Sequence, residues 1–523
     1  MIQPSAPLNS PSPQRFSVVI VGAGPAGLTV GNILRAAGVD CLVLETETRE
    51  FIERRPRAGV IEEWAVRGLE RRGLAGSLLE RAERHTACEF RFDGERYRFA
   101  YQELTGSHHW VYPQPLLVTD LVREYADVRG GDIRFGVRDV RLHDVDGDRP
   151  SVSYTGVDTG RRESVVCDFV AGCDGARGVT RASLAPERAR VARHDYGIGW
   201  LALLAEAPPS ADCVLFGCHP DGFAGQMPRS PEVTRYYLQC PPGDDPDHWP
   251  HERVWAELRR RLGAAGAAPL TEGRLIEKRV LDMHDHVTEP MASGRLFLAG
   301  DAAHLVAPIA AKGMNLALHD AFLLGDALAA RLTRGDDSGL AGYSRECLRR
   351  VWDYQEFSQW LSELYHGSAA GDPFRAGTTL AGCAACSPHP PPLPPSRSST
   401  WARPRGTEPG PSVVRGTVAD PVVRHVQRLV HQPPQMAVAQ GVDDPAALLA
   451  GVHEPREPQP RQMLADRGAC HAAGLGERGD VGLAAGQGVQ QGQPGAVAEQ
   501  GEQLRREREV LLARGAWVRI VRR

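Results

Sequence analysis

The chain has 523 residues, of which 42% are hydrophobic and 24% charged, and these fractions are typical of a soluble globular protein with several domains. The formal net charge of −4 supplies no basic surface and argues against binding to nucleic acid. No apolar run is long enough to span a bilayer, no secretory signal is recognisable, and the 11 cysteines are scattered. We therefore expect a cytoplasmic protein with reduced thiols, no membrane contact and no metal site.

The first motif that carries chemistry lies close to the N-terminus. Residues 16–21 form a continuous apolar run, which predicts a buried parallel strand. A Gly-x-Gly-x-x-Gly sequence then opens a predicted helix and directs backbone N–H groups toward a diphosphate; its members are Gly22, Gly24, Ala26 and Gly27. A second predicted strand, residues 41–44, ends in Glu45, which can bind a ribose hydroxyl. The pattern predicts a dinucleotide-binding domain without distinguishing FAD from NAD.

Two later segments also look like strands that end in this domain. Residues 169–175 form an apolar run that ends in Asp174-Gly175, and residues 295–304 form another that contains Gly300-Asp301. Together with the first motif, and in this order, they resemble the class A FAD-dependent aromatic hydroxylases, in which one FAD domain serves both flavin and pyridine nucleotide. The resemblance covers roughly residues 16–381 and is carried by the segments Arg55–Glu62, Tyr112–Gln114, Gly199–Ala205, His219–Phe223 and Arg235–Gln239.

The resemblance implies an α/β fold. It comprises a doubly wound, Rossmann-like FAD-binding domain and a smaller, mainly antiparallel β domain that binds the substrate. The C-terminal residues are rich in Pro, Gly, Gln and Arg, so we expect a disordered tail or an out-of-frame translation there. The expected divisions are a flexible N-terminus (1–15), the first part of the FAD domain (16–190, with 88–109 on the substrate side), the substrate domain (191–283), the last part of the FAD domain with closing helices (284–381), and the tail (382–523).

Cofactor roles follow from the resemblance residue by residue. It implies that Arg57 and Gln114 hold the flavin. It also implies that Asp301 binds the ribityl chain and that Arg235 helps to position the flavin ring. Further contacts with FAD are implied for Asp174, Lys312, Gly313 and Asn315.

The reduced coenzyme is the second nucleotide that the resemblance implies. Arg177 and Arg181 match residues that contact the pyridine nucleotide. Glu47 follows Glu45 closely, and its carboxylate would repel a 2′-phosphate. The sequence therefore favours NADH, with NADPH as the alternative.

The resemblance implies residues for both ends of the substrate site. Arg229 and Tyr237 match two groups that clamp a substrate carboxylate, and an arginine fork suits a planar carboxylate. Pro308 matches a proline whose carbonyl faces the ring substituent para to that carboxylate. His85 matches a histidine that belongs to a proton relay from the substrate hydroxyl.

Two substitutions in this site depart from the family pattern. Phe216 stands where the family has the tyrosine that contacts the substrate phenol. Met227 replaces a serine of the carboxylate clamp. Because Phe216 has no hydroxyl, the known relay cannot form, and the para end of the site becomes more apolar.

The implied activity is hydroxylation of a small aromatic carboxylic acid with FAD, O₂ and reduced nicotinamide coenzyme. The family proceeds through a flavin C4a-hydroperoxide, and the resemblance points first to conversion of 4-hydroxybenzoate to 3,4-dihydroxybenzoate. Because a neutral para-amine is electron-rich without any relay, a 4-aminobenzoate-type or other substituted benzoate is an alternative. A flavin-binding protein without hydroxylase activity is a second alternative. Aromatic side chains within residues 352–360 are compatible with core packing or with a homodimer.

Overall fold

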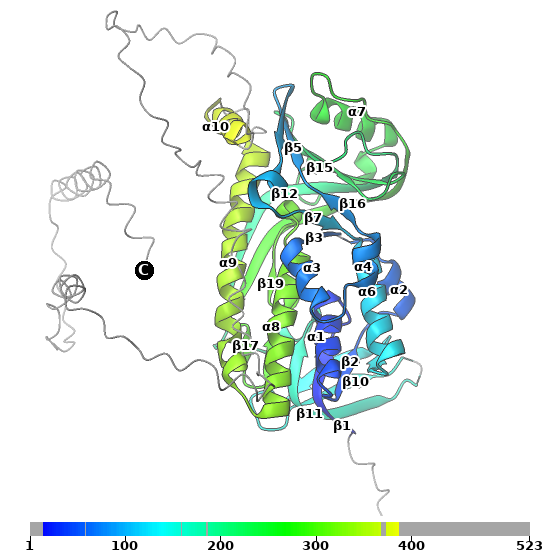
Figure 1. The fold of residues 1–523 in the computed structure, drawn as a ribbon, viewed down its shortest axis with the longest axis vertical. Helices are drawn as coiled ribbons and strands as arrows, with labels where there is room; N and C mark the ends of the chain where they lie inside the picture. The colour runs from blue at the N-terminus through cyan, green and yellow to red at the C-terminus, as the bar shows by residue number, and fades with distance from the viewer. Residues whose placement is uncertain (1–13, 58, 158, 185–186, 368–372, 386–523) are drawn as a thin grey trace, which may run out of the picture. The chain divides into compact units, whose positions relative to one another are not determined.

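A computed structural model describes residues 14–57, 59–157, 159–184, 187–367 and 373–385 (Figure 1). Most of the predicted flexible N-terminus and nearly all of the predicted tail lie outside these residues. Gln14 and Arg15, which were expected to be flexible, instead begin strand β1 because they pair with Val165 and Val166 of β11. Residues 382–385, assigned to the tail, end helix α10 (Pro373–Ala385).

The first sheet has a parallel centre. Its strand order is β17-β18-β11-β1-β2-β8, and the neighbours from β18 to β8 run parallel. Val18, Val19 and Ile20 of β1 are fully buried, as expected for a strand covered on both faces. Antiparallel β10 and β9 extend it beside β11. The strands are β1 (Gln14–Val21), β2 (Cys41–Leu44), β8 (Asp132–Arg134), β9 (Arg138–His143), β10 (Ser151–Thr155), β11 (Arg162–Gly172), β17 (Ala292–Ser293) and β18 (Leu296–Leu298).

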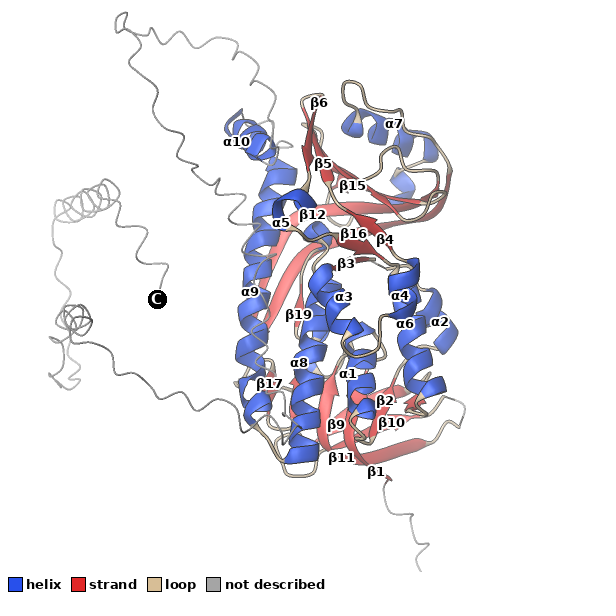
Figure 2. Cartoon of the chain, viewed as in Figure 1, coloured by secondary structure: helices blue, strands red, loops and turns tan. Residues whose placement is uncertain are grey.

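Helices pack on this sheet. Helices α1 and α8 contact each other, and α8 also packs beside the long helix α9 (Figure 2). No helix in the described residues is long and apolar enough to cross a membrane. The helices are α1 (Pro25–Ala36), α2 (Arg49–Arg54), α3 (Glu63–Glu70), α4 (Gly76–Arg81), α6 (Gln114–Val122), α8 (Gly313–Arg334) and α9 (Ser338–His366), with a π-helical turn at Arg123–Val128 and 3₁₀ turns at Arg181–Ser183, Gly300–Ala302 and Pro308–Ala310.

The second sheet is antiparallel except where β13 and β5 pair in parallel. Its order is β19-β16-β12-β15-β14-β13-β5-β6, so residues 88–99 join the sheet formed mainly by residues 190–289. The predicted α/β class, with a mainly antiparallel second domain, is confirmed. The elements are β5 (Cys88–Phe92), β6 (Glu95–Phe99), β12 (Arg190–Glu206), β13 (Val214–Cys218), β14 (Ala224–Pro228), β15 (Thr234–Cys240), β16 (Arg274–Glu289) and β19 (His304–Leu305), with α5 (Tyr101–Thr105), a 3₁₀ turn (Pro246–His248) and α7 (His251–Leu262).

The two faces of this sheet have different partners because side chains alternate along each strand. On one face, Leu201, Leu203 and Leu238 belong to a core that also contains Val254 and Trp255 of α7. The residues between them in sequence point to the other face. There the aromatic cluster joins the sheet to the FAD domain and to α9; its buried members include Phe90, Trp200, Phe223, Ile309 and Tyr365.

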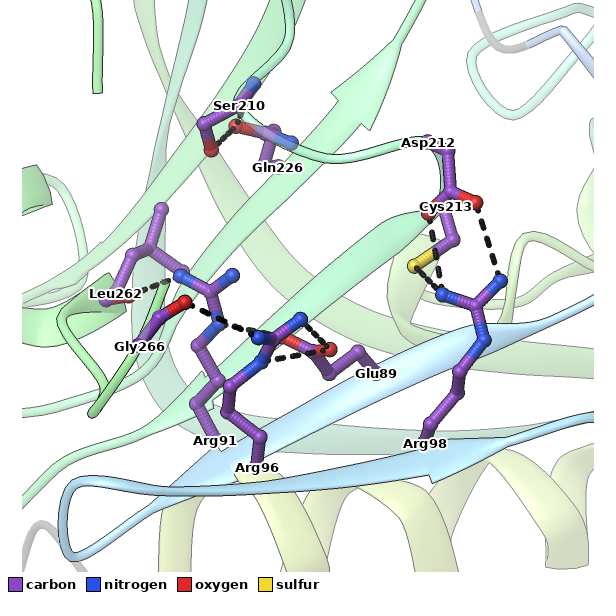
Figure 3. Close-up of polar contacts among 10 residues, drawn as sticks. All are labelled: Glu89, Arg91, Arg96, Arg98, Ser210, Asp212, Cys213, Gln226, Leu262 and Gly266. Carbon is purple, nitrogen blue, oxygen red and sulfur yellow. Dashed lines mark hydrogen bonds and ion pairs between the residues drawn. The ribbon is translucent and has the colours of Figure 1, made fainter. Parts of the chain in front are cut away.

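An ionic network centred on the buried Glu89 joins β5 and β6 at the edge of the second sheet (Figure 3). The Glu89 carboxylate is almost completely buried and accepts hydrogen bonds from Arg91 Nε and from Arg96 Nη2, each 2.8 Å long. Arg98 donates two hydrogen bonds to Asp212, at 3.1 and 3.2 Å, in a largely exposed pair. The contacts of the buried Glu89 need well-defined geometry, since an unpaired buried charge is costly. These contacts thereby fix β5, whose Phe90 belongs to the aromatic cluster.

A small third sheet lies between these two domains. Its order is β3-β7-β4, and both pairs are antiparallel. The strands are β3 (Val60–Glu62), β4 (Glu83–His85) and β7 (His109–Val111). It brings together segments from three separate parts of the sequence.

A buried ion pair anchors the turn after β18. His304 Nε2 lies 2.6 Å from Asp320 Oδ2, and the same oxygen accepts the N–H of Gly300 at 2.9 Å. Both side chains are almost completely buried. Burial opposes charge on His304, but the Asp320 carboxylate raises the pKa of His304 above its usual value. The opposite charge likewise lowers the pKa of Asp320.

Asp320→Asn is expected to lower the free energy of unfolding near neutral pH by about 3–5 kcal/mol, because it leaves one partner of a buried pair without its counter-charge. The raised pKa of His304 stabilises the folded chain at pH values below the pKa that His304 has in the unfolded chain. This contribution disappears as the pH rises through the pKa of His304 in the folded chain. The lowered pKa of Asp320 stabilises the folded chain at pH values above the pKa that Asp320 has in the unfolded chain. This contribution is lost as the pH falls through the pKa of Asp320 in the folded chain. Urea denaturation from pH 2 to 9 measures both effects, since the His304 contribution changes toward the alkaline end and the Asp320 contribution toward the acid end.

Asp326→Asn is the matched control for this measurement. Asp326 lies on the same helix, but its side chain is 45% exposed in its ion pair with Arg72. Solvent screens such pairs, so the control should cost less than about 1 kcal/mol. Equal losses in the two variants would show that the buried pair has no special role.

Candidate functional site

The predicted Gly-x-Gly-x-x-Gly sequence forms a tight turn between β1 and α1. Gly22 has a φ of +105°, and a Cβ there would lie 2.3 Å from the carbonyl oxygen of Cys173. A Cβ on Gly27 would lie 2.0 Å from the carbonyl oxygen of Gly22. A Cβ on Gly24 would meet nothing within 4 Å, and Gly24 precedes a helix with no side-chain cap. The helix N-terminus therefore faces open space, as a diphosphate requires, while Ala26 is buried in its first turn.

Glu45 is held beside this turn. Its Oε2 accepts the N–H of Ala23 at 2.7 Å, and its Oε1 accepts the N–H of Glu47 at 2.9 Å. These bonds place the carboxylate next to the diphosphate-binding turn, where a ribose hydroxyl can reach it. The open helix N-terminus and this acidic acceptor together fit the adenosine half of FAD.

The other two predicted strand ends meet at the same edge of the first sheet. Strand β11 pairs with both β1 and β18, so Asp174 and Asp301 follow neighbouring parallel strands. Asp174 Oδ2 accepts the N–H of Thr180 at 2.9 Å, so this carboxylate stabilises its own loop. Burial raises the pKa of Asp301, although His304 and Arg57 oppose the rise. Asp301 is thus an acceptor at the carboxyl end of β18, where a polyhydroxyl chain could bind.

The segments that contain Arg57 and Gln114 lie side by side. The Tyr112 N–H donates to the carbonyl of Gly59 at 2.7 Å, which joins the two segments. Arg57 is exposed just before β3, and Gln114 is the first residue of α6. The segments that carry the two predicted flavin contacts are therefore neighbours in the fold.

The start of α8 is tied to β3 rather than left free. Lys312 Nζ pairs with the buried carboxylate of Glu62, which sequence analysis did not single out. Asn315 Oδ1 accepts the Glu62 N–H at 2.8 Å, and Asn315 Nδ2 donates to the carbonyl of Val60 at 3.2 Å. Burial favours the neutral acid, but Lys312 and His109 lower the pKa of Glu62 to about 2. These protein contacts place Gly313 at the first position of α8.

The carboxylate end of the expected substrate site lies on the sheet face opposite α7. Arg235 and Tyr237 alternate on β15, and their cross-strand neighbours on β14 are Met227 and Gly225. Arg235 Nη2 donates to Glu277 Oε2 at 2.8 Å, a pairing that only the register of β16 reveals. Arg235 is therefore held by the protein at this position.

Arg229 follows β14 and reaches toward the FAD domain. Its Nη1 would lie 2.7 Å from a Cβ on Gly59, so the guanidinium contacts the segment just before β3. Within the described residues, this buried Nη1 has no hydrogen-bond partner. Burial lowers the pKa of Arg229, whereas interaction with Tyr237 favours the charged form. A buried cationic donor without a partner is costly, and an anionic ligand would satisfy it.

The other end of the expected site is aromatic. The ring of Phe216 lies 4.8 Å from that of Tyr365 on α9 and 5.3 Å from that of Phe90 on β5. Sequence analysis missed Tyr365, because nothing in the local pattern of α9 shows which strand it meets. Pro308 begins the turn whose next residue, Ile309, belongs to the same cluster. Phe216, which the sequence predicts in place of the relay tyrosine, therefore belongs to a set of closely packed aromatic rings.

The remaining predicted residues take different positions. His85 is buried on β4, and within the described residues its Nδ1 has no hydrogen-bond partner. Arg181 Nη1 lies 2.8 Å from His286 Nε2, and its Nη2 donates to the carbonyl of Ala176 at 2.6 Å. Arg177 is exposed. Of the two arginines assigned to the coenzyme, Arg177 is thus the more accessible to a ligand.

Comparison with known proteins gives one clear family. The profile of the family described as FAD binding domain matches residues 15–358. The chain is 38% identical over 354 residues to a p-hydroxybenzoate hydroxylase of Acinetobacter baylyi, covering 67% of this chain and 86% of the relative. It is 30% identical over 336 residues to a 3-(3-hydroxy-phenyl)propionate/3-hydroxycinnamic acid hydroxylase of Mycolicibacterium gilvum, covering 60% of this chain and 54% of that protein.

The fold is also found among solved structures. The p-nitrophenol 4-monooxygenase of Pseudomonas putida superposes with a TM-score of 0.63 at 22% identity, over 71% of this chain and 93% of that structure. At this identity the likeness concerns the fold alone. The fold is therefore shared with a protein whose sequence identity to this chain is low.

Proposed function

Because the chain belongs to the FAD-dependent aromatic hydroxylases, we propose that it hydroxylates a para-substituted benzoate at the ring carbon next to the para substituent. The proposed substrate is 4-hydroxybenzoate, and the proposed product is 3,4-dihydroxybenzoate. The observation that carries this proposal is Arg229. Its buried Nη1 has no partner in the described residues, and Tyr237 interacts with the same guanidinium. A benzoate carboxylate supplies the missing acceptor and the missing charge.

The protein contributes binding, orientation and exclusion of water. When bound, FAD supplies the redox and oxygen-transfer chemistry. Arg229 and Tyr237 would hold the carboxylate, and the aromatic cluster around Phe216 would surround the opposite end of the ring. The packed rings of this cluster keep water from the reacting positions. Glu47 beside Glu45 supports NADH as the reductant, since its carboxylate disfavours a 2′-phosphate.

Phe216 favours a second substrate, 4-aminobenzoate. The side chain at this position is packed against Phe90 and Tyr365 and offers no hydrogen bond to a para group. A para-amine donates electrons to the ring while neutral, so it needs no proton acceptor. The same carboxylate contacts would hold either acid.

The test is NADH oxidation by the purified FAD-loaded chain with each acid, with products identified by chromatography. We expect 3,4-dihydroxybenzoate from 4-hydroxybenzoate. Product from the amine alone would assign 4-aminobenzoate instead, and NADH oxidation without product from either acid would contradict hydroxylation of these benzoates.

Phe216→Tyr sharpens the assignment. Restoring a phenol at this position is expected to raise the rate with 4-hydroxybenzoate by about tenfold or more, since a positioned acid–base group contributes about 10²–10⁴-fold. The rate with 4-aminobenzoate should change less. Phe223→Tyr serves as the control, because Phe223 stacks on Tyr365 as Phe216 does but packs with its other neighbour, Trp200, in place of Phe90. An equal gain in both variants would show that the hydroxyl acts without regard to position.

A further inference from the structure

The chain that leaves β19 is held by two side chains from other elements. The carbonyl of Leu305 accepts the amide N–H of Gln355 on α9 at 3.0 Å. The N–H of Ala307 donates to Asp285 Oδ1 on β16 at 2.6 Å. A helix and a strand therefore fix the backbone on both sides of Val306.

Asp285 is itself oriented by a hydroxyl group. Tyr196 lies on β12 in the stretch where its pairing with β16 is irregular, and its hydroxyl donates to Asp285 Oδ2 at 2.6 Å. Burial raises the pKa of Asp285, while the two hydrogen bonds and the nearby His194 and His284 oppose the rise. Because the side chain is buried and each of its oxygens accepts a short hydrogen bond, the carboxylate has a defined position between β12 and the chain after β19.

The segment held in this way enters the aromatic cluster directly. Ala307 and Ile309 are buried members of the cluster, and Phe216 packs against it. Between them, Pro308 begins a 3₁₀ turn, and its carbonyl accepts the N–H of Ala311 at 3.2 Å. A carbonyl oxygen has two lone pairs, so the Pro308 carbonyl can accept a second hydrogen bond.

The para group of the proposed substrate needs a polar partner at this end of the site. A hydroxyl or amine that is buried without a hydrogen bond is costly, and the side chain of Phe216 offers none. The Pro308 carbonyl is a backbone acceptor in this otherwise apolar turn, and the family resemblance assigns the same carbonyl to the para group. Its direction depends on how the chain enters Pro308, which is set at the N–H of Ala307.

We propose that Asp285 is a positioning residue for the para end of the substrate site. The inference rests on the proposed function. By holding the N–H of Ala307, Asp285 fixes the chain that enters Pro308 and aims the Pro308 carbonyl at the para hydroxyl or amine. Tyr196 keeps the carboxylate in the orientation that this requires. Asp285 thereby sets the preference for acids that carry a para donor over acids that lack one.

The preference for a para group measures this role without turnover. The Kd values of 4-hydroxybenzoate, 4-aminobenzoate and benzoate are obtained by titrating the flavin absorbance of the oxidised, FAD-loaded protein. In the unmodified chain we expect at least one of the two para-substituted acids to bind about tenfold or more tightly than benzoate. Asp285→Ala should lower this preference by about tenfold, because it releases the segment that carries the acceptor, while the Kd of benzoate changes by less than about threefold.

Two further variants separate geometry from charge. Asp285→Asn should keep the preference within about threefold of the unmodified chain, since its amide oxygen can accept the N–H of Ala307 and its amide nitrogen can donate to the oxygen of Tyr196. Tyr196→Phe keeps the ring and loses the hydroxyl that orients the carboxylate, and it should lower the preference by about threefold. It gives a second reading should Asp285→Ala fail to fold.

Asp282→Ala is the matched control. Asp282 lies on the same strand, but its side chain is exposed, so its removal should leave all three Kd values unchanged. An unchanged preference in Asp285→Ala, or in Tyr196→Phe if only that variant folds, would overturn the inference alone. The same holds for an equal weakening of all three acids, which a merely structural role would cause, and for a loss in Asp285→Asn as large as in Asp285→Ala. If the unmodified chain bound neither para-substituted acid more tightly than benzoate, the proposed function would be overturned and the inference with it.

Discussion

Arg229→Lys is expected to raise the KM for the aromatic acid by about 100-fold while FAD remains bound. Removing one partner of a buried, hydrogen-bonded charge pair costs about 2–5 kcal/mol, and each 1.4 kcal/mol is a factor of ten. Lysine keeps the charge but loses the planar fork that can bind both carboxylate oxygens. Steady-state kinetics and titration of the flavin absorbance with the acid measure the loss independently.

Arg274→Lys is the control for this variant. Arg274 lies in the same domain, and its exposed side chain pairs with Glu206 at the protein surface. Its replacement should leave the KM within about twofold, since exposed ion pairs contribute little. If Arg229→Lys left the KM as unchanged as the control does, the carboxylate would have to bind elsewhere.

Gly24→Val is expected to weaken FAD binding strongly without unfolding the protein. The added side chain would project from the residue before α1 into space that is open within 4 Å. That space faces the N–H groups of the helix N-terminus, where the diphosphate of FAD would bind. A steric block at this position should lower the affinity for FAD by 100-fold or more, about 3 kcal/mol. The ratio of flavin to protein after purification, and equilibrium titration of the apoprotein with FAD, measure this.

Gly76→Val provides the comparison. Gly76 also lies at the start of a helix, α4, and a Cβ there also meets nothing within 4 Å. It should retain FAD in full. Denaturation of both apoproteins by urea establishes that neither variant is grossly unfolded, and a Gly24→Val variant that retained stoichiometric FAD would contradict the assigned diphosphate position.

The nucleotide-binding turn could be predicted from the sequence because its determinants are local. Gly22, Gly24 and Gly27 lie within one strand–turn–helix unit and are recognised by their spacing, although the carbonyl oxygen that excludes a Cβ at Gly22 belongs to the distant Cys173. The buried strands on either side were equally visible as short apolar runs. The boundary at residues 14–15 was wrong because pairing with β11, far along the chain, extends β1 beyond its apolar run.

The partners of the predicted site residues could not be predicted in the same way. Lys312 and Asn315 were recognised by their position after β18, yet their contacts with Glu62 and Val60 join residues about 250 positions apart. The pairing of Arg235 with Glu277 depends on the register of β15 and β16 against β12. A shift of one residue in either strand would turn the side chain to the opposite face.

The sequence by itself determined the nucleotide-binding turn, which depends on a short-range pattern of apolar residues, glycines and charges. Its resemblance to the aromatic hydroxylases implied the two-domain α/β plan and the residue types expected at each end of the substrate site. Only the tertiary structure decided that a buried donor of Arg229 has no partner among the described residues, that Tyr365 packs on Phe216, and that His85 is directly opposite His109. The physical reason is that burial, register and pairing between distant strands are properties of the packed chain and have no local signature.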